Sequence, residues 1–195
     1  MADIKTLENL GKAFIGESMA RNRYTMYASI ARKEGYQNIA EIFLATAMNE
    51  VEHAEWNMRM LNAVAAKTGS KADSAVESEV PHVVKTTAEN LAAAMAGEHY
   101  ETTKMYPDFA AVAQKEGFPD VAARLRAIGT VEAHHEARYK TLLELVKTGT
   151  VFKRDEKVKW VCMKCGYVHE GNEPPVKCPS CDHDKSYYLL LCENF

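Results

Sequence analysis

The feature that most limits how this chain can fold is an internal repeat within a long helix-forming stretch. Residues 31–36 read ARKEGY, and residues 113–118 read AQKEGF, 82 positions later. Ala, Leu, Met, Glu, Lys and Arg, which favour helices, are abundant from residue 4 to residue 147. The pattern predicts a four-helix bundle in which one half repeats the other. The predicted helices span residues 4–33, 37–66, 87–115 and 119–147.

The breaks between these segments carry residues that end or begin helices. Gly35 and Gly117 suit helix C-termini, where a left-handed backbone is common. Pro119 suits a first helical turn, since the missing amide of proline has no helical partner there. Thr86 and Glu89 have the spacing of a capping box. These signals predict where three of the four helices start or stop.

A polar stretch, residues 67–81, separates the second predicted helix from the third. It is long enough to cross the length of the bundle. One long crossover among short turns predicts a mainly α fold, the ferritin-like four-helix bundle. The composition changes after residue 150, so we assign residues 1–149 to the bundle and 150–195 to a second, smaller domain.

The two halves of the repeat differ by one residue. Gly16 and Glu17 match Gly97 and Glu98 at an offset of 81, whereas the later positions match at 82. One residue is therefore inserted in the third helix, between Glu98 and Ala113. An extra residue within a continuous helix is usually accommodated as a π-bulge, often beside a functional site. We predict a π-bulge in this segment.

Two Glu-x-x-His tetrads, at 50–53 and 132–135, occupy equivalent positions of the repeat. Residues three apart share one face of a helix, so each tetrad can direct a carboxylate and an imidazole to one point. A single match is most often a solvated helix face, whereas two equivalent matches favour a metal site. One glutamate on each remaining helix completes the ligand pattern of di-iron carboxylate bundles. The predicted ligands are Glu17, Glu50, His53, Glu98, Glu132 and His135.

Glu101 is an additional candidate ligand. It lies three residues after Glu98, where the first half of the repeat has Ala20. A surface glutamate is the simpler interpretation. The alternative is a fifth carboxylate that binds when the irons are ferric, with His53 taking its position when they are ferrous. Glu101 and His53 are therefore also candidate catalytic residues.

Charge balance supports two metal ions at this place. Carboxylates buried together without cations would have to stay partly protonated, and burying their charges would cost much free energy. Two ferrous ions nearly cancel the five candidate carboxylates. Oxygen and imidazole ligands suit iron or manganese better than copper, and they leave zinc open.

Four tyrosines could hydrogen-bond the ligating carboxylates. Each could equally be packed in the core. Tyr24 and Tyr106 are the preferred pair, and we count them among the candidate catalytic residues. Tyr27 and Tyr100 are weaker candidates.

The second domain contains all five cysteines of the chain. Four of them form a C-x2-C-x12-C-x2-C pattern, which predicts two metal-binding knuckles closing a tetrahedral site. Tetrahedral sulfur suits both zinc and iron, and the neighbouring di-iron bundle favours iron because a redox site needs a route for electrons. Short strands are expected near 158–161 and 187–191. The predicted ligands are Cys162, Cys165, Cys178 and Cys181, with Cys192 outside the pattern as a small buried residue or an inert thiol.

The bulk properties favour some classes of function over others. A net charge of −3 gives no support for nucleic-acid binding. The longest weakly polar run, 91–97, is far too short to cross a bilayer. Residues 1–5 lack an apolar signal region, so we expect a cytoplasmic protein whose cysteines bind metal and form no disulfides.

Along essentially its whole length, the sequence resembles the rubrerythrin family. In the bundle, the resemblance includes Gly16-Glu17, the tetrad at 50–53, Gly97-Glu98-x-x-Glu101 and the tetrad at 132–135. In the tail it includes WVCMKCGY at 160–167 and the closing ENF, as in rubredoxins. Asp182 departs from the pattern, because rubredoxins often have glycine after the last ligating cysteine. Aspartate tolerates the left-handed backbone better than most residues.

The resemblance implies a non-haem peroxidase of the anaerobic or microaerobic cytoplasm that reduces hydrogen peroxide to water. It implies that Glu50 and Glu132 bridge two irons, with Glu98 and His135 as terminal ligands of one. Glu17 would bind the other iron, on which Glu101 and His53 would exchange with redox state. It also implies a homodimer in which the tail of one subunit lies near the di-iron site of its partner.

The source of electrons is expected to be a separate protein. The chain contains no G-x-G-x-x-G motif, so reducing power from NADH or NADPH would arrive through an external reductase or a rubredoxin. Two alternatives remain at this point. One is a ferroxidase or iron-storage protein that shares the bundle, and the other is a non-catalytic interaction protein with a zinc ribbon.

Overall fold

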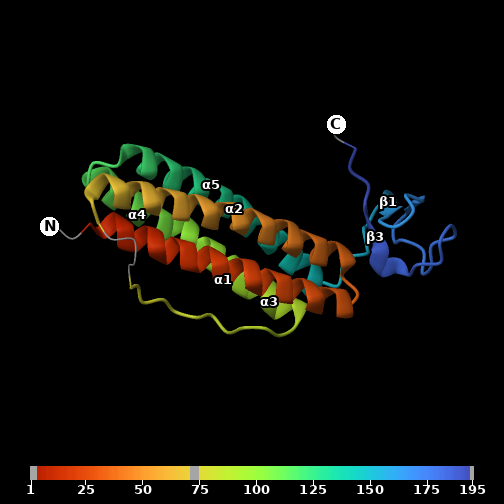
Figure 1. Cartoon of the computed structure of the whole chain (residues 1–195). Coiled ribbons are helices and arrows are strands. Elements are labelled where there is room, and N and C mark those ends of the chain that lie inside the picture. The colour runs from red at the N-terminus through yellow and green to blue at the C-terminus, as the bar shows by residue number, and fades with distance from the viewer. Residues whose placement is uncertain (1–3, 71–74, 194–195) are drawn as a thin grey trace.

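The computed structural model describes residues 4–70 and 75–193. It is a long helical body with a small sheet at one end (Figure 1). The predicted four-helix bundle is confirmed, and its third helix is continuous from α3 through a π-helical segment, η1, to α4. The helices are α1 (Lys5–Lys33), α2 (Gln37–Thr68), α3 (Thr87–Tyr100), η1 (Glu101–Met105), α4 (Tyr106–Lys115) and α5 (Pro119–Lys147).

The two copies of the repeat end their helices in the same way. In each copy the glycine has a φ near +84°, and the amide of the next residue bonds back to the first residue of the motif. Tyr36 N donates to Ala31 O at 2.8 Å, and Phe118 N donates to Ala113 O at 2.9 Å. This six-to-one bond is the Schellman pattern. The repeated sequence therefore forms the same turn twice. Each turn reverses the direction of the chain between two consecutive helices.

The crossover between the two pairs follows the outside of the body (Figure 1), and residues 75–86 have no regular secondary structure. Tyr27 on α1 donates its hydroxyl to Val83 O at 2.7 Å, and Asn90 exchanges two hydrogen bonds with the backbone of Lys85. The predicted capping box of Thr86 and Glu89 is confirmed at the start of α3. Part of the predicted crossover, residues 71–74, lies outside the described residues.

The predicted π-bulge is also confirmed, and its position can be defined more closely. Glu101 stands 81 residues after Ala20, while Tyr106 stands 82 residues after Tyr24. The inserted residue therefore lies within η1. A π-helical turn lets the third helix continue into α4 with the same face toward the core as its counterpart in the first half.

The core of the body is divided by a polar layer. One apolar cluster includes Leu10, Leu61 and Leu125, and another includes Tyr27 and Phe43. The carboxylates and histidines predicted to bind metal lie between them along the bundle and are almost completely buried. Burial of several ionisable groups between apolar layers is costly unless charge compensates them. The helices therefore enclose a site rather than a continuous hydrophobic core.

The tail contains three antiparallel strands in the order β2-β1-β3. The strands are β1 (Val158–Cys162), β2 (Val168–Gly171) and β3 (Tyr188–Leu190), with a short 3-10 turn, η2 (Lys185–Tyr187), before the last. The sequence predicted β1 and β3 but missed β2, which has no buried face. Trp160 is buried and donates Nε1 to Gly171 O at 3.0 Å, which ties β1 to the end of β2.

The tail packs against the end of the body where α1 turns into α2. The ring of Tyr36 stacks on that of Phe152, with centroids 6.3 Å apart, and α2 contacts both η2 and β3. The boundary near residue 149 stays a prediction. In the described part of the chain, none of the helices has a stretch that is both apolar and long enough to span a bilayer.

Candidate metal centres

Four helices bring the six predicted ligands of the body to one place. Their nitrogen and oxygen atoms form two groups, in each of which all atoms lie within 4.8 Å of one another. Both groups contain Glu50 and Glu132. The first group is Glu17, Glu50, His53 and Glu132, and the second is Glu50, Glu98, Glu132 and His135. The sequence-based prediction that these residues converge is confirmed.

The two shared glutamates each turn one oxygen toward each group. His53 Nδ1 lies 3.0 Å from Glu50 Oε2 and 2.9 Å from Glu132 Oε1. His135 Nδ1 lies 3.4 Å from Glu50 Oε1 and 2.9 Å from Glu132 Oε2. Nitrogen and oxygen ligands about 2.1 Å from one ion are about 3 Å apart when they meet at a right angle. The spacing therefore suits two ions bridged by two carboxylates.

Each group also has one glutamate of its own. Glu17 Oε1 lies 3.9 Å from His53 Nδ1, and Glu98 Oε2 lies 3.5 Å from His135 Nδ1. Glu17 and Glu98 are fully buried and stand at equivalent positions of the repeat. The site thus has a pseudo-twofold arrangement in which each half of the chain supplies three side chains.

Unpaired polar atoms test whether this donor set fits metal ions. Buried polar atoms in proteins nearly always have a partner, so a cluster of unpaired ones needs an explanation. Six atoms of the predicted ligands have no hydrogen bond within the described part of the chain. They are Glu17 Oε2, Glu50 Oε1, Glu98 Oε2, both carboxylate oxygens of Glu132, and His135 Nδ1. Two divalent cations would satisfy them, and hard oxygen with imidazole ligands suits iron.

The electrostatics of the cluster point in the same direction. Burial raises the pKa of Glu98 to about 7 and holds the pKa of Glu17 well above its ordinary value, and the neighbouring carboxylates add to both shifts. Burial opposes protonation of the histidines, yet the adjacent carboxylates outweigh it, raising the pKa of His53 to about 9 and that of His135 to about 10. Without cations the site therefore holds protons that metal ions would displace.

We expect the metal-free protein to lose stability as the pH rises from about 5 to about 10. A group whose folded pKa is raised stabilises the fold below its unfolded pKa, and this stabilisation is lost as the pH rises through the folded value. Glu98, His53 and His135 all act in this sense. The pKa of Glu132 is lowered despite its burial, because the imidazoles of His135 and His53, each 2.9 Å from one of its oxygens, favour its ionised form. Its stabilisation is therefore lost only at acid pH.

Urea unfolding of metal-free and iron-loaded protein at several pH values measures this effect. The free energy of unfolding of the metal-free form should fall across that range, while that of the loaded form should change much less. A metal-free protein that becomes more stable with rising pH would contradict the protonation pattern.

Two tyrosines donate to the terminal glutamates, as predicted. Tyr24 OH donates to Glu98 Oε1, and Tyr106 OH donates to Glu17 Oε1. Each tyrosine therefore bonds the glutamate of the opposite half of the repeat. Asn57, which is fully buried, donates to Tyr106 OH at 3.4 Å. The sequence analysis missed Asn57, although its position one turn after His53, on an otherwise apolar face, was a signal.

The other tyrosine candidates do not touch the ligands. Tyr27 bonds the crossover backbone, and Tyr100 is 56% exposed. Glu101 is half-buried and belongs to neither group of ligand atoms. Its pKa is nonetheless held well above the ordinary value, by burial and then by the charge of Glu98. Glu101 thus lies beside the cluster of ligand atoms, whereas His53 is one of its members.

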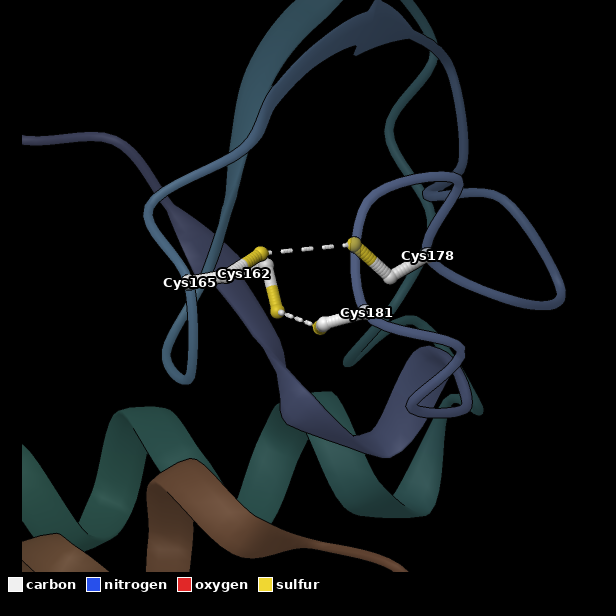
Figure 2. A group of neighbouring side chains, drawn as sticks. All are labelled: Cys162, Cys165, Cys178 and Cys181. Atoms are coloured by element: carbon white, nitrogen blue, oxygen red, sulfur yellow. Dashed lines mark hydrogen bonds between the residues drawn. The ribbon is translucent and has the colours of Figure 1, made fainter.

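The four predicted cysteines of the tail also converge (Figure 2). Cys162 Sγ lies 3.7 Å from Cys181 Sγ, and Cys165 Sγ lies 3.6 Å from Cys178 Sγ. Four sulfurs bound tetrahedrally at about 2.3 Å from one ion would be about 3.8 Å apart. None of the four forms a disulfide. The spacing therefore suits a single tetrahedral metal ion.

The knuckle backbone favours thiolates at this site. Burial opposes ionisation of Cys178, yet the hydroxyl of Tyr188 and the amides of Ser180 and Cys181 outweigh it and lower the pKa of the thiol to about 6. Asp182 adopts the left-handed conformation, with φ of +60°, as expected from its tolerance of that geometry. Cys192 is exposed, so the alternative that it is a small buried residue is wrong.

Comparison with known proteins agrees with both sites. A family model described as rubrerythrin matches residues 8–143, and one described as the rubrerythrin, rubredoxin-like domain matches residues 160–188. A putative rubrerythrin of Methanocaldococcus jannaschii is 56% identical over 98% of this chain and 95% of its own length. Rubrerythrin-1 of Clostridium acetobutylicum is 46% identical over 98% of this chain and 96% of its own.

Solved structures show the same architecture. Nigerythrin in its fully reduced, all-ferrous state matches with a TM-score of 0.63 and 30% identity, covering 98% of this chain and 89% of that one. Partially reduced nigerythrin matches with a TM-score of 0.62 and 31% identity, covering 98% and 88%. With a carboxylate-bridged di-iron site in its helical body and a four-cysteine site in its rubredoxin-like tail, the chain belongs to the rubrerythrin family.

Proposed function

We propose that the protein is a non-haem di-iron peroxidase that reduces hydrogen peroxide to water in defence against oxidative stress. The observation that supports it best is the presence, in one chain, of a buried two-metal carboxylate site and a thiolate site suited to one-electron transfer. A ferroxidase or iron-storage protein has no use for the second site. A zinc-ribbon interaction protein has no use for the first.

The proposed ligand roles follow the geometry. Glu50 and Glu132, which belong to both groups, would bridge the two irons, and the remaining members of each group would bind one iron alone. In the tail, Cys162, Cys165, Cys178 and Cys181 would hold a single iron. The exchange of Glu101 for His53 with redox state stays a prediction. His53 Nδ1 lies 2.9 Å from Glu132 Oε1 within one group of ligand atoms, and Glu101 belongs to neither group.

When bound, the diferrous pair supplies the two electrons that break the O–O bond of the peroxide. The chain supplies orientation and protons. Tyr24 and Tyr106 hold the terminal glutamates in place through their hydroxyls, and Asn57 holds Tyr106 in turn. Burial, and then the charge of Glu98, raises the pKa of Glu101, which favours the protonated form of its carboxyl. It can donate that proton to a leaving oxygen.

The route of the electrons leads us to propose a homodimer. The tail packs at the end of the body where α2 begins, and α2 runs about 20 Å from Gln37 to Glu50 at 1.5 Å per residue. Electron tunnelling slows steeply with distance, so the tail of a partner placed beside the bundle would serve the metal pair better. An external NAD(P)H-dependent reductase or a rubredoxin would reduce the tail, in a cytoplasm that keeps its thiols reduced.

Anaerobic rapid mixing of the fully reduced protein with hydrogen peroxide tests this function. We expect fast oxidation of the di-iron and four-cysteine chromophores, with water as the product. Oxidation by oxygen alone, followed by accumulation of ferric mineral in a large shell, would favour the ferroxidase alternative. A colourless tail containing stoichiometric zinc would contradict the proposed electron relay.

The Glu101→Ala variant tests the role of Glu101. We expect peroxide turnover to fall at least about 100-fold, because general acid catalysis contributes on that scale and the fifth carboxylate is also lost. Iron in the tail should be unchanged. Asp108→Ala is a matched control, since Asp108 is an exposed acid in the same continuous helix, paired with Lys104. A turnover rate equal to that of the wild type would show that Glu101 has no role in the reaction.

A further inference from the structure

We propose that the protein also reduces neutral organic hydroperoxides, which bind in a recess beside Glu101 with their apolar group between α1, η1, α4 and the crossover. The inference rests on the proposed peroxidase function and extends its range of substrates.

The recess has a volume of about 490 Å³ and is partly open to solvent. It lies on the side of the body that the crossover covers. Its walls include the side chains of Met19 on α1, Met105 on η1 and Phe109 on α4, together with Pro81 of the crossover. All of these are apolar, and the apolar part of the wall exceeds the polar part. A hydrocarbon group would therefore be buried favourably there.

The recess lies beside the metal cluster, although none of the six ligands lines it. Gly16 and Gly97 line it, and each immediately precedes a terminal glutamate of the cluster. Glu101 also lines it and stands three residues after Glu98 in the same continuous helix. A peroxide group held at Glu101 would thus stand beside the metal pair, with the rest of the molecule in the recess.

The size of the recess exceeds what hydrogen peroxide needs. A water molecule accounts for about 30 Å³ in the liquid, and hydrogen peroxide is only slightly larger. Two glycines widen the recess further. A Cβ atom added at Gly16 would meet nothing within 4 Å, and one added at Gly97 would first meet Arg23 Nη2 at 3.9 Å. The open space at these positions would accept a group as large as isopropylbenzene.

The charges around the recess favour a neutral molecule. Arg23 and Lys12 lie in its wall, and so do Glu77 and Glu79 of the crossover. Lys12 is already paired with Glu8, at 2.7 Å. The positive charge is therefore balanced, and an anionic hydroperoxide would gain little from it. Arg23 also lines the recess, and a guanidinium donates hydrogen bonds of the kind that a hydroperoxide oxygen accepts.

The reaction is balanced in the same way as that of hydrogen peroxide. An organic hydroperoxide, ROOH, takes up two electrons and two protons to give the alcohol, ROH, and water. The O–O bond breaks, and the oxygen bonded to carbon stays in the alcohol. The electrons come from the same reduced metal pair that the proposed function uses, and the protons come from Glu101 and solvent.

Variants in which a larger side chain fills the recess test whether hydrogen peroxide and organic hydroperoxides differ in their need for this space. In the Gly16→Leu variant the added side chain would occupy the open space, and Gly97→Val fills it from the facing helix if the first variant does not fold. Thr25→Leu is the control, because Thr25 is exposed on α1 and lies outside the recess. Each fully reduced protein is mixed anaerobically with hydrogen peroxide and, separately, with cumene hydroperoxide.

We expect the wild type and Thr25→Leu to be oxidised by both peroxides. In Gly16→Leu the ratio of the rate with cumene hydroperoxide to the rate with hydrogen peroxide should fall at least about tenfold. The reason is that the leucine side chain would occupy the space that the apolar group of cumene hydroperoxide needs. A wild type that reacts with neither peroxide would refute the proposed function itself. A wild type that reacts only with hydrogen peroxide, or a filled variant with an unchanged ratio, would overturn the organic substrate alone.

Binding can be measured without turnover. Cumyl alcohol, the product of cumene hydroperoxide, is added to the purified oxidised protein, and ligand-observed NMR detects transfer of saturation from the protein. The transfer should be present for the wild type and Thr25→Leu and lost in Gly16→Leu. Equal transfer in all three proteins would place the alcohol outside the recess and overturn the inference.

Discussion

The Glu132→Ala variant should lose both iron ions of the helical body and keep the iron of the tail. Glu132 offers one oxygen to each group of ligands, with Oε1 2.9 Å from His53 and Oε2 2.9 Å from His135. Its removal therefore weakens both positions at once. Changes in residues that merely support ligands cost about 10- to 100-fold in metal affinity, so loss of a shared ligand should cost at least about 100-fold at each position.

Iron analysis and the absorption spectrum measure this result. The iron content should fall from about three to about one per chain, with the spectrum of the four-cysteine site preserved. Glu136→Ala is the control, because Glu136 lies one turn further along the same helix and pairs with His99 outside the cluster. A Glu132→Ala protein that retains one tightly bound iron in the body would show that the two positions are independent.

The Cys178→Ser variant should separate electron supply from peroxide chemistry. Cys178 is buried, its thiol is acidified by Tyr188 and two backbone amides, and its sulfur faces Cys165. Serine replaces a thiolate with a neutral hydroxyl, so the tail should lose its iron. Steady-state peroxide turnover with an external reductase should then fall at least about 100-fold, on the scale of other lost metal-site interactions.

The same variant, reduced chemically in advance, should still be oxidised by one equivalent of peroxide, because the body is intact. Cys192→Ser is the matched control, since Cys192 is exposed and lies outside the ligand set. Full steady-state turnover without the tail iron would mean that electrons enter the body directly, and it would contradict the relay.

Local rules of the sequence were enough to place the helices and the ligands. Each of the helix signals is a property of a short segment. These signals are the glycine that ends the helix in each copy of the repeat, the capping box at Thr86 and the one-residue offset between the copies. The tetrads of Glu50 and Glu132 also act locally, because spacing along one helix decides which side chains share a face. Such features depend little on the rest of the fold, which is why they could be predicted.

Features that depend on distant segments could not be predicted in this way. Strand β2 has no buried residue, and it forms because its backbone pairs with that of β1. Asn57 matters because Tyr106, from another helix, lies against it. The recess beside Glu101 is completed by the crossover, whose path no short pattern in the sequence specifies. Which of Glu101 and His53 approaches the metals also depends on packing between helices.

The inserted residue in η1 has a consequence for the origin of this body. A hairpin of two helices that paired with a second copy of itself about a twofold axis would form two equivalent metal positions with the same ligands. When the two copies are joined in one chain by the crossover, the sequence of each copy can change independently of the other. The second copy has Glu101 where the first has Ala20, and the inserted residue follows it in η1, so the surroundings of the two positions differ. Asymmetry of this kind gives a duplicated scaffold one side on which a substrate can enter.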